Sequence, residues 1–181
     1  RDIASERPPW FDDPLLGVRA EAARWLAGAS PDLMTAAQAS VLARAVDDFR
    51  ATLAVNADRP EAQLNRGNLE QALGRNAEAE SAYRVATELD PGFAVAYAGL
   101  ANVCGLYYEW HERDARWVEK GLAASEKALE LSPNLPEALS ARARIFYAQK
   151  DYDKTARLAE QAVALKPDCD GAYYMLGRAC F

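Results

Sequence analysis

Histidine is nearly absent from this sequence of 181 residues, which contains His111 and no other. The three cysteines, Cys104, Cys169 and Cys180, form no CxxC or CxxCH pair. This spacing excludes a zinc ribbon, a thioredoxin-type redox motif and a c-type haem attachment site. We expect all three cysteines to be buried free thiols, and we predict neither a metal nor a resident cofactor.

Positive charge is also in short supply, with 21 Lys and Arg against 27 Asp and Glu and a net charge of −6. No basic cluster is present, so we predict that the chain does not bind nucleic acid, whose phosphates require one. There is no apolar run of about 18 residues, which a membrane-spanning helix needs, and no charged-then-apolar leader within the given residues, so we expect no membrane insertion; a leader upstream of Arg1 stays open. Glycine-rich phosphate loops, nucleophile elbows and HExxH are likewise missing, so we predict no enzymatic activity.

What the sequence does contain is a repeat, seen in residues 59–91 and again in residues 135–167. Both segments begin with Pro-Glu-Ala, end with Leu-x-Pro and carry a polar turn midway. Apolar residues and alanines recur every three or four positions, as on the buried stripe of an amphipathic helix. Each segment is therefore predicted to form two helices of about 14 residues, begun by the first proline and stopped by the last.

The residues at fixed positions of this repeat are those of a known family. In the first unit Gly67, Ala79, Tyr83, Ala86 and Pro91 match the signature of the tetratricopeptide repeat, which this segment resembles. The later unit matches at Leu139, Ala143, Phe146, Tyr152, Ala162 and Pro167. The resemblance implies an all-α solenoid of helix-turn-helix units stacked in a right-handed superhelix.

Three positions depart from the family pattern. Gln63 and Arg66 stand where the family has an aromatic residue and a leucine, and Thr155 stands where it has an alanine. We therefore expect looser packing at the start of the first unit.

The predicted organisation is an N-terminal HEAT-like helix or cap at 1–33 and a tetratricopeptide array at 34–181. The array consists of a half repeat at 34–58, repeats at 59–92, 93–134 and 135–168, and a partial repeat at 169–181. Residues 12–28 resemble the second helix of a HEAT repeat, with Asp13 as N-cap and Pro14 as first helical residue. Because the last segment is apolar, we expect more chain to follow it.

Two halves of the chain resemble different parent proteins. Residues 12–100 resemble the segment after the haem domain of some bacterial multihaem cytochromes, although they carry no haem motif. Residues 101–181 resemble repeats attached to signalling and regulatory proteins. The compartment follows this division: the cytoplasm is favoured, and the periplasm if the cytochrome resemblance holds.

The repeat at 93–134 is longer than its neighbours. Pro133, which closes this repeat, lies 42 residues after Pro91, which closes the preceding one, whereas Pro133 and Pro167 are 34 apart. Eight extra residues are close to two helical turns, so each helix is expected to gain about one turn and the hairpin to protrude. The tip contains Tyr107, Trp110, His111, Asp114 and Trp117.

We expect Tyr107, Trp110 and Trp117 to hold the two extended helices together, with Asp114 capping the second one. A lone histidine has no converging partners for metal binding or acid–base chemistry. The tip, with Tyr107, Trp110, His111 and Trp117, is instead a candidate docking surface.

The tetratricopeptide resemblance also implies a binding surface, because the first helices of that family line a concave face on which extended peptides lie. The family's carboxylate clamp uses the ninth residue of each unit, which here gives Asn68, Asn102, Arg144 and Arg178. The fifth residues are Leu64, Ala98, Ser140 and Tyr174, so both lysines of the clamp are missing. The implied partner is an extended, acidic peptide of another protein.

In this hypothesis Asn68 and Asn102 hold the peptide backbone, Arg144 and Arg178 attract an acidic residue, and Tyr147 and Tyr174 give apolar contact. The alternative is that these polar residues are ordinary solvated surface residues.

The predicted function is a protein-protein interaction scaffold. Two alternatives stay open: a non-catalytic accessory domain of a larger redox or signalling enzyme, and a solenoid that forms homo-oligomers through its exposed ends.

Overall fold

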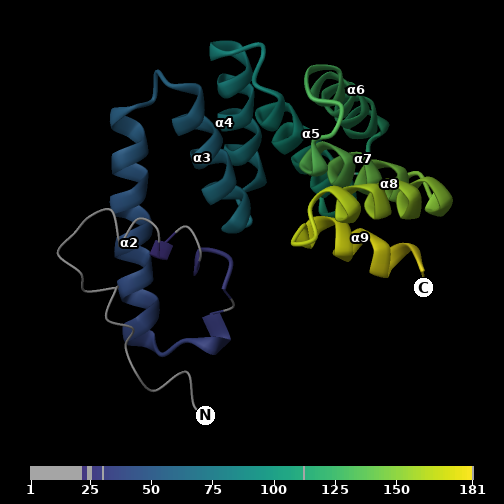
Figure 1. The fold of residues 1–181 in the computed structure, drawn as a ribbon. Helices are drawn as coiled ribbons and strands as arrows, with labels where there is room; N and C mark the ends of the chain where they lie inside the picture. The colour runs from purple at the N-terminus through teal and green to yellow at the C-terminus, as the bar shows by residue number, and fades with distance from the viewer. Residues whose placement is uncertain (1–21, 24–25, 30, 112, 181) are drawn as a thin grey trace.

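The computed structural model describes residues 22–23, 26–29, 31–111 and 113–180, and these form an all-helical array (Figure 1). The predicted all-α class is confirmed. Most of the HEAT-like segment, including Asp13 and Pro14, lies outside the described residues. The elements are η2 (Pro31–Leu33), α2 (Ala36–Val55), α3 (Pro60–Ala72), α4 (Asn76–Leu89), α5 (Ala94–Trp110), α6 (Ala115–Leu131), α7 (Pro136–Ala148), α8 (Tyr152–Leu165) and α9 (Asp170–Ala179).

Helix α2 is a single helix of 20 residues that runs along one end of the array (Figure 1). It begins at a capping box, in which the Thr35 side chain accepts a hydrogen bond from the Gln38 N–H and the Gln38 side chain accepts one from the Thr35 N–H. Ala45 and Phe49, which the helical spacing placed on the packed face, are buried. This helix covers most of the segment predicted as a half repeat.

The remaining helices form the adjacent pairs α3–α4, α5–α6 and α7–α8, followed by α9 (Figure 1). Pro60 and Pro136 stand at the first turn of α3 and α7, where the missing N–H costs nothing. Helices α4, α6 and α8 each end at the leucine of a Leu-x-Pro sequence. The helix boundaries therefore follow from local chemistry, as predicted.

Small residues at equivalent positions allow the helices to pack closely. Ala86, Ala128 and Ala162, one in each second helix, are fully buried. In the first pair the larger Tyr83 occupies the seam, because Gly67 on α3 and Gly99 on α5 have no side chains in its way. A Cβ at Gly99 would lie 2.6 Å from the Tyr83 ring, so this wedge excludes any larger residue there.

The long hairpin is the α5–α6 pair. Each of these helices has 17 residues, whereas α3 and α7 have 13 and α4 and α8 have 14. The prediction that each helix gains about one turn is confirmed. The Asp114 side chain accepts a hydrogen bond from the Arg116 N–H and so caps α6, also as predicted.

Two aromatic rings hold this hairpin together. Tyr107 and Trp117 stack with ring centroids 4.3 Å apart and an interplanar angle of 7°. The prediction for Trp110 was wrong, since its side chain is 68% exposed and takes no part in the stack. The space between α5 and α6 holds one aromatic ring from each helix, and Trp110 lies outside it at the last residue of α5.

The cysteine prediction is correct for two of the three residues. Cys104 and Cys169 are buried free thiols, whereas Cys180 is exposed at the end of α9. Burial raises the pKa of the Cys104 thiol to about 12. Thr155 is accommodated in place of alanine because its hydroxyl donates to the Asp151 carbonyl at 2.9 Å.

Candidate protein-interaction surface

A hollow of about 460 Å³ lies across the first helices of the repeats. We call it the Asn102 hollow. Its wall is mostly polar and uncharged, with two charged side chains, Arg144 and Glu137, both on α7. It is lined by Asn68, Gln71, Tyr83, Val95, Ala98, Gly99, Asn102, Glu137, Ser140, Ala141, Arg144, Cys169 and Gly171.

A hydrogen bond from Arg144 fixes the orientation of the Asn102 amide. Arg144 Nε donates to Asn102 Oδ1 at 2.9 Å. Because arginine can only donate, the oxygen must face Arg144 and the NH₂ group must face the other way. That NH₂ group has no partner among the described residues, so it is a donor available to a ligand.

Asn68 is held in a similar manner by the buried Tyr83. The Tyr83 hydroxyl donates to Asn68 Oδ1 at 2.8 Å and lies 3.2 Å from Gln71 Oε1. Burial raises the Tyr83 pKa above its ordinary value, so the hydroxyl remains protonated and able to donate. The Asn68 NH₂ group is left as a second donor on the neighbouring first helix.

A buried carboxylate joins three repeats at the edge of the hollow. Glu109, on the extra turn of α5, accepts from Arg144 on α7 and from Arg178 on α9, each at 2.9 Å. Its side chain is 7% exposed and that of Arg144 is 10% exposed. Gly105 makes room for this pairing, since a Cβ there would lie 2.6 Å from the Arg144 Cδ.

Arg178 is the more accessible of the two arginines, with a side chain 28% exposed. Its guanidinium lies 4.0 Å from the centroid of the Tyr147 ring and 5.4 Å from that of Tyr174. These contacts are cation–π interactions. The two tyrosines therefore support the arginines, and the exposed half of Tyr174 is what remains for a ligand.

The structure divides the predicted peptide-binding residues between two places. Asn68, Asn102 and Arg144 line the Asn102 hollow, whereas Tyr147 and Arg178 line a second depression of about 360 Å³. Tyr174 lines neither depression and packs against the two arginines. The alternative that all these polar residues are solvated is wrong for Arg144, which is buried and bonded on two sides. Sequence reasoning missed Glu109 as their partner; its spacing of seven residues from Asn102 on one helix was the available signal.

We call the second depression the Trp110 groove. It runs between the tip of the long hairpin and the turn after α7, and its lining includes Trp110, Arg113, Tyr152 and Lys150. Arg113 and Lys150 are exposed and have no ion pair with a described residue. Of the candidate docking residues on the hairpin, Trp110 lines this groove. Tyr107 and Trp117 stack on each other instead.

His111 lies outside both depressions. Its Nε2 is 3.4 Å from Asn76 Nδ2 at the start of α4. Nowhere in the described ranges do three or more His, Cys, Asp or Glu side chains converge to hold a metal ion. None of the described helices has the length and apolar character needed to cross a bilayer.

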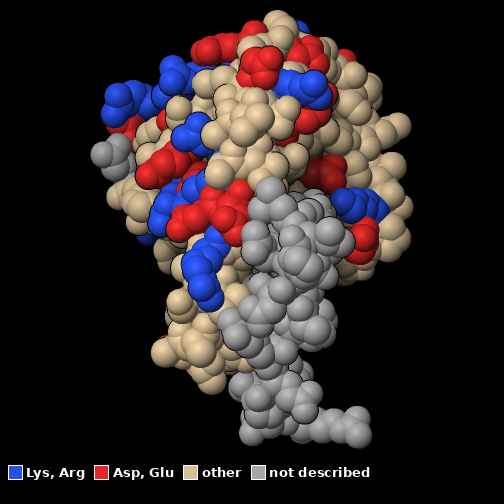
Figure 2. Space-filling view, turned by 90° about the vertical axis from the view of Figure 1, so that its left-hand side faces the viewer, with Lys and Arg blue, Asp and Glu red and all other residues tan. Residues whose placement is uncertain are grey.

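The described part of the surface in Figure 2 carries acidic and basic side chains interspersed, without a continuous basic area.

The comparison with protein families gives one match: the tetratricopeptide repeat model matches residues 60–93. This range is the α3–α4 pair, where the signature residues are found. The chain therefore contains a tetratricopeptide repeat (TPR) within a TPR-like helical array. TPR domains are generally protein-protein interaction modules and are typically non-catalytic, which agrees with the predicted class of function.

Solved structures with this TPR fold extend the similarity to most of the chain. A thermophilic TPR protein of Thermus thermophilus is 19% identical with a TM-score of 0.67, covering 88% of this chain and 80% of its own. The first TPR of Spaghetti, bound to the HSP90 peptide SRMEEVD, is 18% identical with a TM-score of 0.53 and covers 68% and 92%. The Arabidopsis OM64 TPR domain is 18% identical with a TM-score of 0.52 and covers 66% and 93%.

These identities establish the fold and nothing finer. No curated protein sequence matches the chain significantly. The resemblance to multihaem cytochromes and to signalling proteins therefore stays a prediction.

Proposed function

We propose that this TPR array binds an extended, acidic segment of a partner protein along the Asn102 hollow. The observation that carries the proposal is the Glu109 carboxylate held between Arg144 and Arg178 beside the Asn102 amide. These side chains come from three successive first helices, which form the surface used for extended peptides in this fold.

The peptide backbone would be held by the two asparagines. Both amides turn their oxygen inward, to Tyr83 and to Arg144, and leave an NH₂ group for a ligand. A peptide carbonyl is an acceptor, so such a donor can bind it whatever side chain the peptide residue carries. Asn68 and Asn102 therefore supply affinity for an extended backbone of any sequence.

Acidic specificity would come from the arginines. Glu109 already occupies them, so it acts as an internal competitor for the carboxylate of the ligand. The accessible edge of Arg178, together with Arg113 and Lys150 along the Trp110 groove, attracts an incoming acid in a chain that is negative overall.

The missing lysines favour an internal segment over a free C terminus. Residues at the fifth positions, Leu64, Ala98, Ser140 and Tyr174, carry no positive charge for a terminal carboxylate. The Spaghetti neighbour binds the acidic peptide SRMEEVD, which makes that peptide a suitable first probe for this chain as well.

The test is a fluorescence anisotropy titration with three labelled peptides: SRMEEVD, its C-terminal amide, and SRMQQVN, in which the acidic side chains are neutralised. We expect the first two to bind alike and the third to bind at least about tenfold more weakly, which is a loss of about 1.4 kcal/mol. Equal binding of all three would refute the acidic preference. Loss of binding on amidation alone would show a C-terminal clamp in place of an internal-segment site.

Two variants connect the binding to the named residues. Replacing Glu109 by Gln removes the internal competitor, so acidic peptides should bind more tightly to E109Q. Replacing Asn102 by Ala removes a backbone donor and should weaken all peptides by about 1 kcal/mol. A matched control is Glu119→Gln, an exposed glutamate of α6 without an ion pair in the described structure.

A second candidate function is docking of a partner side chain on the Trp110 groove. It rests on the 68% exposure of Trp110, a large aromatic residue at the protruding tip, beside Arg113 and Lys150, which form no ion pair with a described residue. Aromatic and arginine residues are those that most often dominate the binding energy of interfaces. If the acidic segment extends onto this groove, Trp110→Ala should weaken a longer acidic peptide and leave SRMEEVD unchanged.

A further inference from the structure

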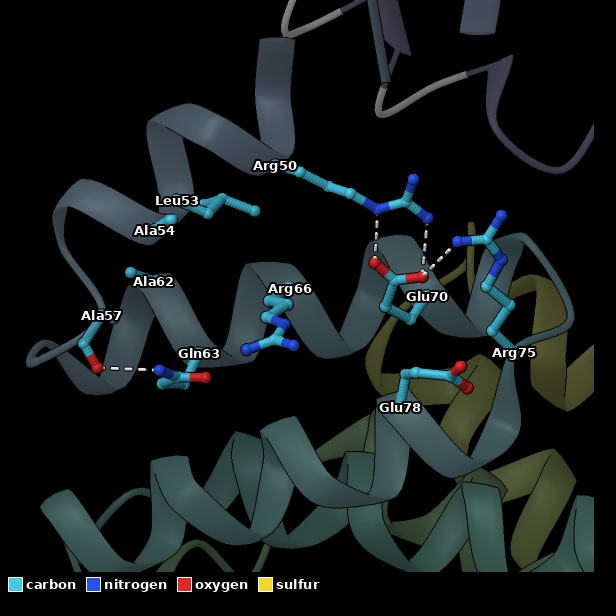
Figure 3. A pocket seen from close by; sticks show the side chains of 10 residues that line it. All are labelled: Arg50, Leu53, Ala54, Ala57, Ala62, Gln63, Arg66, Glu70, Arg75 and Glu78. Atoms are coloured by element: carbon cyan, nitrogen blue, oxygen red, sulfur yellow. Dashed lines mark hydrogen bonds and ion pairs between the residues drawn. The ribbon is translucent and has the colours of Figure 1, made fainter. Parts of the chain in front are cut away.

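A cavity of about 430 Å³ lies between α2, α3 and the start of α4, and we call it the Gln63 pocket (Figure 3). It shares no lining residue with the Asn102 hollow or the Trp110 groove. Its chemistry is accordingly independent of the proposed peptide-binding function.

The pocket exists because α3 lacks the apolar side chain that its neighbours have. The residues equivalent to Gln63 are Tyr97 in α5 and Leu139 in α7, and both pack into apolar clusters. The apolar residues around Gln63, which are Leu53, Ala54 and Ala62, do not fill the space between them. The looser packing expected at Gln63 and Arg66 is found here.

Gln63 leaves an acceptor without a partner inside this space. The residue is 6% exposed, and its Nε2 donates to the Ala57 carbonyl at 2.7 Å. That hydrogen bond fixes the amide, so Oε1 lies on the side facing Arg66 in Figure 3. Oε1 is buried and has no hydrogen bond. An unsatisfied buried acceptor is unfavourable, and a ligand with an N–H donor removes the penalty.

One arginine that lines the pocket, Arg66, is exposed and takes only a minor part in the ion pairs around Glu70. The Glu70 side chain is 5% exposed, and its carboxylate accepts two hydrogen bonds from the Arg50 guanidinium, at 2.7 and 2.8 Å. Arg75 Nη1 lies 3.7 Å from Glu70 Oε2. The Arg50 hydrogen bonds hold the pKa of Glu70 below its ordinary value, so Glu70 stays an anion that is already satisfied.

The far end of the pocket carries the exposed carboxylate of Glu78 on α4 (Figure 3). An anionic ligand therefore finds its attraction at Arg66, away from Glu78. Three arginines against two glutamates leave the pocket with a positive balance.

We propose that the Gln63 pocket binds a small aromatic carboxylate whose ring carries an N–H donor, such as an indole carboxylate. The ring lies against Leu53, Ala54 and Ala62, in the space that an aromatic residue fills in the next repeat. The ring N–H donates to Gln63 Oε1, and the carboxylate pairs with Arg66. One ligand would thus fill the apolar space, donate a hydrogen bond to the unsatisfied Gln63 acceptor and pair with the accessible Arg66.

The experiment is an NMR titration of the whole chain with indoleacetate. Two matched probes each lack one feature: naphthaleneacetate has no N–H donor, and indole has no carboxylate. We expect indoleacetate to bind saturably at millimolar concentrations and each matched probe to bind at least about fivefold more weakly. Shifted resonances should belong to residues that line the pocket.

Two variants assign the binding. Gln63→Leu removes the acceptor and fills the space with the residue that α7 has at this position, so it should fold normally and unfold at a higher temperature. Arg66→Gln removes the cation. Each should weaken indoleacetate by at least about tenfold, while Arg84→Gln, an exposed arginine of α4 outside the pocket, should leave binding unchanged.

Either of two results overturns the proposal: no saturable binding of indoleacetate to the unmodified chain, or binding that survives both Gln63→Leu and Arg66→Gln. Gln63→Leu should leave the affinity for SRMEEVD unaltered. A failure of the pocket proposal is thereby separate from a failure of the peptide-binding proposal.

Discussion

Glu109 is the residue whose replacement tests the structure of the interaction surface most severely. In Glu109→Gln the side chain keeps its size but loses its charge, so both arginines lose their anion. The side chain of Arg144 is 10% exposed, so its charge stays buried and is left with neutral oxygen partners, among them that of Asn102. Removing one member of a buried ion pair costs about 3–5 kcal/mol.

The lower end of that range applies here, because the glutamine oxygen still accepts one hydrogen bond and Arg178 can reach solvent. We expect the free energy of unfolding to fall by about 3 kcal/mol, which lowers the melting temperature by about 6–12 °C for a chain of this size. Guanidinium unfolding followed by circular dichroism measures it. The exposed control Glu119→Gln should change stability by less than about 0.5 kcal/mol. If Glu109→Gln behaves like this control, the buried carboxylate bridge does not exist as described.

Three further predictions concern packing. Gly67→Ala should lower the free energy of unfolding by about 2 kcal/mol, because its Cβ would collide with the Tyr83 ring, whereas Gly177→Ala, with open space around it, should raise it by about 0.5–1 kcal/mol. Denaturant titrations of the two variants check this, and equal effects would contradict the wedge. Trp117→Ala should cost about 3 kcal/mol through the lost stack and Trp110→Ala less than about 0.5 kcal/mol, as measured by thermal unfolding; the reverse order would contradict the hairpin geometry. A thiol reagent at neutral pH should modify Cys180 rapidly and the two buried cysteines only after unfolding, and mass spectrometry showing all three modified in the native protein would be inconsistent with their burial.

The helices could be predicted because their ends are set by neighbouring residues. Proline at the first turn, Leu-x-Pro at the end and Asp114 at the N-cap each act within a few residues, and all are found where expected. The length of the hairpin followed from the spacing of prolines for the same reason. The HEAT-like and half-repeat divisions stay predictions.

The site was less predictable because it depends on contacts between distant residues. Glu109 meets Arg144 and Arg178 across 35 and 69 residues of chain, and the extra turn of α5 is what brings it there. The ninth residue of each repeat identified both arginines as site residues, but it gave no indication of Glu109, the carboxylate that they share. The prediction for Trp110 was wrong because the space between α5 and α6 is filled by Tyr107 and Trp117. The spacing of aromatic residues in the sequence does not show which of them fills that space.

The most direct test of the proposed function is an NMR titration of the chain with the acidic peptide SRMEEVD. We predict saturable shifts concentrated in the first helices α3, α5, α7 and α9, including the side-chain amides of Asn68 and Asn102. We also predict that the same shifts appear at lower peptide concentration in Glu109→Gln. Shifts confined to the second helices α4, α6 and α8, or none at millimolar peptide, would contradict it.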